Sequence, residues 1–430
     1  MAGIKVCFSG LKGFTLFLAA FAAFNVILSL TVARESPLTS HGLKFLDFSS
    51  IKAPGDIIPL YDVLQTEKKY GSSLIYRENF FKRHLKFIYP PTALVFFRPL
   101  QDLDRDRFIF VTTSIINRIF LLFGIATIFW FFNRFANRAG RTPGDIVLQN
   151  VSITLLLFTF YPYFKAFTLG QAQIWINALI LFSLMNYDRG KEGLSGVAMG
   201  FCTLIKPSYG LALLWGLLAK RKRFAVAFLI VVLCGLAASL ALYGWQNHLD
   251  YVRTLNYIGN HGEGYYPNQS INGFLNRILR NGNNLHWVAD KYPPENALVR
   301  WGTAGTSLLI LGLALSCCWR NRKRPNILSY LIILLSITIA SPIAWEHTYG
   351  FTFIIFLLLW EAIFRGGLKN KGIPVAAVAF SYLLSSHFLH FLNMRFADTG
   401  WNFLQSYLLL GELIVLALLY RFQKRTDFVN

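Results

Sequence analysis

Charged residues are scarce in this chain of 430 residues, and acidic residues are the scarcest: Asp, Glu, Lys and Arg make up 15% of the sequence, with 21 acidic against 42 basic residues. Hydrophobic residues make up 54%. A soluble domain does not have this composition, whereas a protein that crosses the membrane several times does. The net charge of +21 lies in short clusters between apolar runs. This distribution argues against nucleic acid as a partner and for contacts with the lipid bilayer.

Cysteines and repeats are also lacking. The chain has five cysteines, all in or beside apolar segments, so neither a disulfide framework nor a zinc site is expected. No internal repeat divides the sequence into two matching halves. This absence argues against a secondary transporter built from inverted repeats.

Long apolar runs dominate what is present, and their lengths predict an all-α polytopic membrane protein with about ten full transmembrane helices. Two further stretches are interrupted or opened by prolines, and we expect them to be re-entrant or interfacial: 88–100 and 193–219. The ten runs are 14–33, 108–132, 146–167, 171–187, 224–245, 300–318, 326–344, 349–364, 373–392 and 402–420.

Basic clusters between these runs predict the orientation, because Lys and Arg collect in cytoplasmic loops. With 193–219 as a hairpin, all five clusters face the cytoplasm, together with both termini. The hydrophilic loops 34–106 and 246–299 and the short turn 345–348 then share the outer face. We expect one membrane-embedded domain over 1–430, in a cell inner membrane, with its active site on the periplasmic or outer face formed by these loops.

Three polar clusters adjoin apolar runs on that outer face. Ionisable groups at membrane depth are costly and usually mark a functional cavity. We therefore expect the clusters to share a site: Phe87-Ile-Tyr-Pro-Pro91, the segment from Asn268 to Arg277, and Ser341-Pro-Ile-Ala-Trp-Glu-His347.

Several of these residues have two interpretations. Asp47 can be a general base for group transfer, or it can cap a helix that starts near Ser50. Lys206 can extend to the membrane interface or bind a lipid phosphate. Tyr89 can belong to a rigid proline corner or line a substrate groove. The acidic run 102–106 is interleaved with arginines and is interpreted as a self-neutralised loop rather than a metal site.

Motifs in a fixed order carry a resemblance to a known family. They are Asp47-Phe48 with Tyr61-Asp62, Phe87-Ile-Tyr-Pro-Pro91, Gly170-Gln171, Gly196 with Lys206-Pro207, Asn268-Gln-Ser270 with Gly273 and Arg277, and Ser341-Pro-Ile-Ala-Trp-Glu-His347. Together they resemble glycosyltransferase family 87, membrane enzymes of the C-type glycosyltransferase fold that use polyprenyl-phosphate sugars.

The resemblance implies an inverting glycosyltransferase that moves a sugar, with mannose as the family's precedent, from a polyprenyl-phosphate donor to a hydroxyl of a glycolipid or polysaccharide. It implies no metal and no cofactor beyond the lipid-linked substrate. A flippase or transporter of lipid-linked sugar is the alternative. The catalytic residues it implies are Asp47 and His347, and the substrate-binding candidates are Tyr89, Gln171, Lys206, Asn268, Gln269, Arg277 and Glu346.

Overall fold

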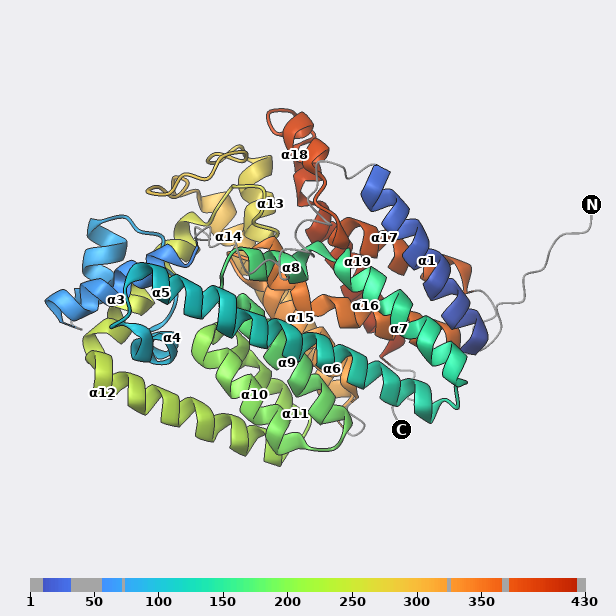
Figure 1. Ribbon diagram of the computed structural model, residues 1–430. Helices are drawn as coiled ribbons and strands as arrows, with labels where there is room; N and C mark the ends of the chain where they lie inside the picture. Colours follow the sequence, from blue (N-terminus) through green and yellow to red (C-terminus); the bar gives the residue numbers. More distant parts are fainter. Residues whose placement is uncertain (1–10, 32–55, 72–73, 323–325, 366–370, 424–430) are drawn as a thin grey trace, which may run out of the picture.

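The computed structural model describes residues 11–31, 56–71, 74–322, 326–365 and 371–423, and these residues form helices and connecting turns without a strand (Figure 1). The predicted all-α fold is confirmed for this part of the chain. A single isolated antiparallel bridge among the described residues joins Asn268 to Trp345.

Six helical segments in the described part of the chain are long and apolar enough to cross a membrane. Two bent pairs raise this number to eight if each pair forms one span: α7 (Pro143–Phe158) with α8 (Tyr161–Thr168), bent by 55°, and α17 (Gly372–Ser386) with α18 (His390–Phe396), bent by 75°. The six are α1 (Leu11–Thr31); α5, η5 and α6 together (Arg105–Ile109, Phe110–Ile116 and Asn117–Arg138); α12 (Lys222–His261); α14 (Ala297–Arg320); η7 with α16 (Glu346–Thr352 and Phe353–Arg365); and η8 with α19 (Asn402–Ser406 and Tyr407–Phe422).

The expectation of about ten full spans is therefore wrong. Two of the ten apolar runs form helices that are too short, α9 (Gln173–Asp188) with 16 residues and α15 (Ile327–Ala340) with 14. A hydrocarbon core of about 30 Å needs roughly 20 helical residues. Helix α15 ends early because Pro342 disfavours helical backbone at the preceding Ser341, whose ψ is 134°.

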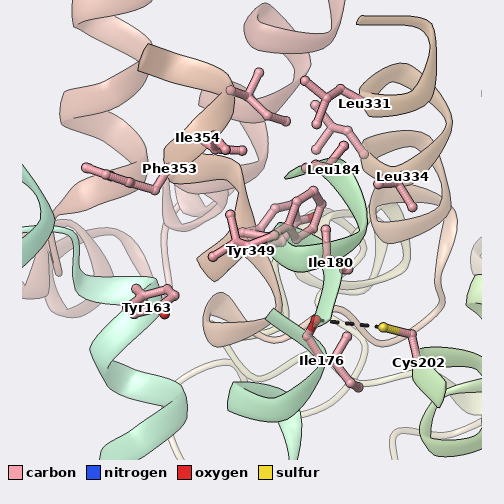
Figure 2. Close-up of a cluster of buried hydrophobic side chains, with 14 of the residues drawn as sticks. Tyr163, Ile176, Ile180, Leu184, Cys202, Leu331, Leu334, Tyr349, Phe353 and Ile354 are labelled. Carbon is pink, nitrogen blue, oxygen red and sulfur yellow. Dashed lines mark hydrogen bonds between the residues drawn. The ribbon is translucent and has the colours of Figure 1, made fainter. Parts of the chain in front are cut away.

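The short helix α15 and helix α16 lie in the middle of the bundle. Every residue of α15 is buried, as expected for a helix that is apolar on all sides. Figure 2 shows part of this core, in which Leu334 of α15 and Phe353 of α16 belong to the same cluster as Ile180 of α9. Leu308 of α14, by contrast, is 73% exposed, and an exposed apolar helix face in a membrane protein contacts lipid.

The interrupted stretch 193–219 forms α10 (Glu192–Ile205), η6 (Pro207–Leu211) and α11 (Ala212–Leu218). Its two ends meet, because Arg221 Nη1 lies 2.8 Å from Glu192 Oε1. The stretch therefore runs inward and returns as a hairpin, as predicted, and Lys206 lies at the inner turn between α10 and η6.

Shorter helices form parts of the segments that connect the long helices. The stretch 88–100 forms α4 (Pro91–Phe97) and η4 (Arg98–Leu100), which are too short to cross a bilayer. Helix α13 (Ile271–Ile278) lies between α12 and α14 and starts at Ser270, whose Oγ accepts a hydrogen bond from Gly273 N. The segment before α5 contains α3 (Ile58–Tyr70) and η3 (Arg77–Lys82).

The bundle has two chemically different ends. At one end, which we call the basic end, Arg138 pairs with Asp188, Arg141 pairs with Glu361, and Asn326 Nδ2 donates to Gln423 O. The opposite end, which we call the site end, contains α8, α13, α18 and η7. In Figure 1, α13 and α18 lie near each other at the top of the molecule.

Candidate functional site

Two of the predicted polar clusters, far apart in the sequence, are joined at the site end. Around the bridge between Asn268 and Trp345, Gln269 N donates to Ala344 O over 2.8 Å. The Asn268 side chain closes this joint, because Ala344 N donates to its Oδ1 (2.9 Å) and its Nδ2 donates to Pro342 O (3.2 Å). The two clusters are therefore in direct contact.

Gln269 extends the joint to the C-terminal helices. Its Nε2 donates to Gln405 O (2.8 Å), and its Oε1 accepts a hydrogen bond from Leu409 N (3.2 Å). Asn268 and Gln269 are both fully buried, and their amides bond to main-chain groups. They hold the framework of the site, while direct contact with a substrate stays a prediction for both.

Glu346 follows this joint and begins η7. Its carboxylate is buried and accepts hydrogen bonds from the hydroxyl groups of Tyr161 (3.1 Å) and Tyr407 (3.5 Å). The positive charges of Lys165 and Arg277 also act on it. Glu346 thus connects α8, η7 and α19 through one carboxylate.

His347 comes next in η7 and is 5% exposed. Its main-chain oxygen accepts a hydrogen bond from Asn177 Nδ2 (3.4 Å). The imidazole has no hydrogen-bond partner among the described residues, so it is available to a ligand. Two basic side chains, Lys165 of α8 and Lys206 at the turn of the hairpin, lie close enough to act on it electrostatically.

These two lysines come from interrupted helices. Lys165 lies on α8, beyond the 55° bend after α7, and Lys206 lies where α10 stops before Pro207. The turn at Lys206 is tied to the third polar cluster, because Thr92 Oγ1 donates to Leu204 O over 2.6 Å. No carboxylate among the described residues lies within the 4.0 Å that defines an ion pair with either lysine. Both positive charges are therefore available to a bound anion.

Asp56, Gln171 and Tyr89 form a neighbouring group. Gln171 Nε2 donates to Asp56 Oδ2 over 2.5 Å, and the Tyr89 hydroxyl lies close enough to Asp56 and to the main chain of Ala172 for both to act on it electrostatically. The Asp56 side chain is exposed, but the surrounding protein partly desolvates its carboxyl, and this raises the pKa of Asp56 above 3.8. The hydrogen bond from Gln171 and the positive charge of Lys165 act in the opposite direction and lower this pKa.

Arg277 of α13 is buried behind the joint. Its Nη1 donates to Asn268 O (3.0 Å), and its Nη2 donates to Ser406 Oγ (2.7 Å). Burial lowers the pKa of the guanidinium to about 9, and the negative charge of Glu346 opposes this shift. Arg277 therefore brings a positive charge to the site from the loop 246–299.

The structure places eight of the nine predicted site residues in this region: Tyr89, Gln171, Lys206, Asn268, Gln269, Arg277, Glu346 and His347. Asp47, the predicted base, lies outside the described residues. The sequence analysis missed Lys165, Tyr161, Tyr407 and Asp56. Lys165 had a signal, because a lysine inside the apolar run 146–167 is costly unless it serves a site.

The acidic run 102–106 forms ion pairs instead of a cluster. Lys68 Nζ lies 2.8 Å from Asp102 Oδ1, and Arg107 Nε lies 3.2 Å from Asp104 Oδ2. Asp104 also caps α5 by accepting a hydrogen bond from Arg107 N. In the described part of the chain, no three His, Cys, Asp or Glu residues lie close enough together to hold a metal ion.

The helices and the buried polar site define a multi-pass, all-α membrane protein with an ionisable centre at one end of an apolar bundle. The sequence profile of glycosyltransferase family 87 matches residues 87–342, more than half of the chain, so the protein belongs to that family and is a membrane glycosyltransferase. The matched range contains six of the predicted site residues and excludes Asp47, Glu346 and His347. No curated protein matches the chain significantly.

Proposed function

We propose that this protein is an inverting mannosyltransferase that uses a polyprenyl-phosphate donor and glycosylates a hydroxyl of a glycolipid or polysaccharide on the outer face of the membrane. The observation that carries the proposal is that Lys165 and Lys206 both lie close enough to His347 to act on it electrostatically, at the site end of the apolar bundle. Among the described residues, none of the three has a carboxylate partner within 4.0 Å.

A lipid-linked phosphate has the chemistry that suits this group. When the bond between the sugar and the phosphate breaks, the phosphate oxygen gains negative charge, and fixed cations in a low-dielectric site stabilise that charge strongly. Lysine ammonium groups bind phosphate as point charges, and a histidine N–H can donate a hydrogen bond to it. The apolar bundle beside the site suits the polyprenyl chain.

The reaction that we propose is a single displacement. The acceptor oxygen attacks the anomeric carbon, its proton passes to the Asp47 carboxylate, and the polyprenyl phosphate leaves with the electron pair of the broken bond. The configuration at the anomeric carbon inverts, so a β-linked donor gives an α-linked product. A monophosphate leaving group surrounded by protein cations does not require a metal, and we expect transfer to continue in EDTA.

The basic end determines the orientation that we propose for the protein in the membrane. Because Lys and Arg collect in cytoplasmic loops, we propose that the basic end faces the cytoplasm and the site end faces the periplasm or the outside. This orientation gives cytoplasmic termini and an enzyme of the cell inner membrane, with the loops 34–106 and 246–299 forming the active-site face of one domain.

The test compares wild type with Asp47→Asn in nanodiscs that contain radiolabelled polyprenyl-phosphate mannose and a lipid extract of the host. Asp56→Asn is the matched control, because it removes a carboxylate from the same outer loop. We expect wild type to form a labelled, slower-migrating glycolipid, and Asp47→Asn to lose about 10²- to 10⁴-fold in rate. The control is expected to retain more activity.

Each other outcome has a distinct meaning. Equal rates in wild type and Asp47→Asn would show that the base lies elsewhere. Loss in Asp56→Asn alone would assign the base to Asp56. If wild type transfers no label but moves the donor across a liposome bilayer, the protein is a flippase and the proposed reaction is wrong.

A further inference from the structure

A hollow of about 420 Å³ lies on the surface of α6 at the basic end. Helix α9 packs beside α6 and ends next to the hollow, at Asp188. The hollow lies at the opposite end of the bundle from the candidate active site, and no role described above uses it. Its walls are side chains from the end of α6: Trp130, Asn133, Arg134, Asn137 and Arg138.

Positive charge exceeds negative charge around the hollow. Arg134 Nε and Arg138 Nη1 lie 3.5 Å and 3.4 Å from the same oxygen of Asp188, its Oδ2. Strong hydrogen bonds between charged groups are roughly 2.7–2.9 Å long, so neither arginine is tightly bound to this carboxylate. Arg189, which follows α9, has no carboxylate within 4.0 Å in the described part of the chain. One carboxylate is therefore set against three guanidinium groups.

Trp130 holds the third arginine beside the hollow. The Cζ atom of Arg189 lies 4.7 Å from the centroid of the Trp130 ring, and that of Arg134 lies 5.7 Å from it. A guanidinium within about 6 Å of an indole ring is attracted to it by a cation–π interaction. The Trp130 side chain is 37% exposed, and tryptophan is enriched where the hydrocarbon of a bilayer meets the headgroups. Trp130 therefore indicates that the hollow lies at the membrane surface.

The face of α6 that carries the hollow becomes apolar toward the middle of the bundle. Leu122 is 52% exposed, Phe123 is 37% exposed and Ala126 is also exposed. They precede Trp130 by about one or two turns, so they lie on the same side of the helix. Arg134 lies about 17 Å beyond Phe123 along the helix, close to half of the roughly 30 Å thickness of the hydrocarbon core. The acyl chain of a lipid in one leaflet therefore reaches from these apolar side chains to the arginines.

A phosphate group has the chemistry that suits the hollow. Guanidinium groups bind phosphate oxygens through paired, charge-assisted hydrogen bonds. The side chain of Asp188 has no exposed surface, so a ligand meets the arginines and not the carboxylate. Basic pockets at the ends of transmembrane helices bind the headgroups of anionic lipids in this way.

We propose that the hollow on α6 binds the phosphate of one anionic phospholipid, whose acyl chains lie along Leu122, Phe123 and Ala126. A free phosphate ion would meet the same arginines, but it has no use for the apolar face that continues from them. The inference is independent of the proposed function, because no substrate or step of the transfer reaction is placed at the basic end.

The test uses Arg189→Gln, because Arg189 is exposed and its removal leaves no buried carboxylate without a partner. Arg322→Gln is the matched control. The Cζ atom of Arg322 lies 4.0 Å from the ring centroid of Trp319, which is 53% exposed and belongs to a different helix, α14, at the same end of the bundle. Both substitutions remove one positive charge stacked on an exposed tryptophan, so a difference between the two variants reports the hollow.

Native mass spectrometry of the protein in detergent measures the binding of single lipid molecules. The probes are phosphatidylglycerol, which is anionic, and phosphatidylcholine, which is neutral overall, with the same acyl chains. We expect the first phosphatidylglycerol to bind wild type about tenfold or more tightly than the first phosphatidylcholine. Arg189→Gln is expected to weaken the binding of phosphatidylglycerol about fivefold, whereas Arg322→Gln retains the wild-type affinity. Thermal unfolding without added lipid checks that both variants are folded.

Three outcomes would overturn the proposal. Equal preference of wild type for the two lipids would show that the hollow does not select an anionic headgroup. Equal losses in Arg189→Gln and Arg322→Gln would show a general attraction of the basic end for anions. A third arm adds glycerol phosphate, the soluble headgroup without acyl chains, in large excess. We expect it to leave the lipid bound, whereas displacement of the lipid would make the hollow a site for a free anion.

Discussion

The two ends of the helical bundle differ in how their charges are paired. At the basic end, Glu361 bonds to two arginines, with Arg141 Nη2 and Arg365 Nε both 2.6 Å from its carboxylate oxygens. At the site end, Lys165 and Lys206 have no carboxylate within 4.0 Å among the described residues. A complete buried ion pair needs nothing from outside the protein, whereas cations without a carboxylate partner can attract an anionic ligand. The difference separates charges that are paired within the fold from charges that we propose to serve the reaction.

The largest effect on stability is expected when the buried ion pair at the basic end is disrupted. Glu361→Gln leaves the buried Arg141 without its counter-charge, and removing one partner of a buried ion pair typically costs about 3–5 kcal/mol. We expect a lower melting temperature in detergent, with unchanged kcat per folded molecule. A double variant, Arg141→Met with Glu361→Leu, is the control, because a well-packed apolar replacement is often neutral. An unchanged melting temperature in Glu361→Gln would contradict a structural role.

The next largest effect is expected on kcat, when basic side chains at the site end are removed. Lys165→Met and His347→Ala each remove a group that we propose meets the developing charge of the phosphate, and loss of one such group costs about 10²- to 10³-fold in kcat. Because Lys165 has no carboxylate partner within ion-pair distance among the described residues, we expect its removal to lower the melting temperature less than Glu361→Gln does. Transfer rates and thermal unfolding are measured on the same preparation. A large loss of stability with normal kcat would reverse the assignment.

A smaller effect concerns the joint between the polar clusters. Asn268→Ala leaves the main-chain N–H of Ala344 without its side-chain acceptor, and an unsatisfied buried donor costs about 1–3 kcal/mol. We expect both the melting temperature and kcat/KM to fall, because the joint positions Glu346. Asn283→Ala is the control, since its side chain accepts hydrogen bonds from the exposed turn at Leu285 and His286. Equal effects of the two substitutions would show that the joint does not position the site.

The smallest effect depends on pH. The pKa of Asp56 is raised above 3.8 in the folded protein, so the folded state binds this proton more tightly than the unfolded state. The resulting stabilisation, relative to Asp56→Asn, is present at low pH and is lost as pH rises from 3.8 through the raised pKa. The melting temperatures of both proteins, measured from about pH 4 to pH 8, give this difference. A difference that is independent of pH would contradict the shift.

The sequence predicted the class of fold, and it marked the polar segments that the tertiary structure brings together. Long apolar runs require helices in a bilayer, because every main-chain polar group there must be satisfied internally. The cluster that begins at Asn268 and the cluster that ends at His347 could be found in the sequence, because their polar residues interrupt the apolar pattern. Lys206 was visible for the same reason, since Pro207 breaks the hairpin next to it.

The number of spans and the role of α8 could not be predicted from apolar length alone. The runs 171–187 and 326–344 resemble transmembrane segments, but α9 has only 16 residues and begins after the turn that contains Gln171, and α15 ends early, before the turn that leads to His347. The run 146–167 resembles a single straight span, but it bends by 55° before α8 and carries Lys165 to the site. A bend depends on packing against other helices, which hydropathy does not record.

The sequence by itself determined that this protein is helical, lies in a membrane and carries its polar groups in a few interrupted segments, because the bilayer penalises unsatisfied polar groups wherever they occur. Only the tertiary structure decided which charges are paired. Glu361 and Glu346 both lie in or next to apolar helix, but one bonds to two arginines and the other to two tyrosines. Electrostatic partners are set by distances of a few ångströms between segments far apart in the chain, and those distances exist only after the helices pack.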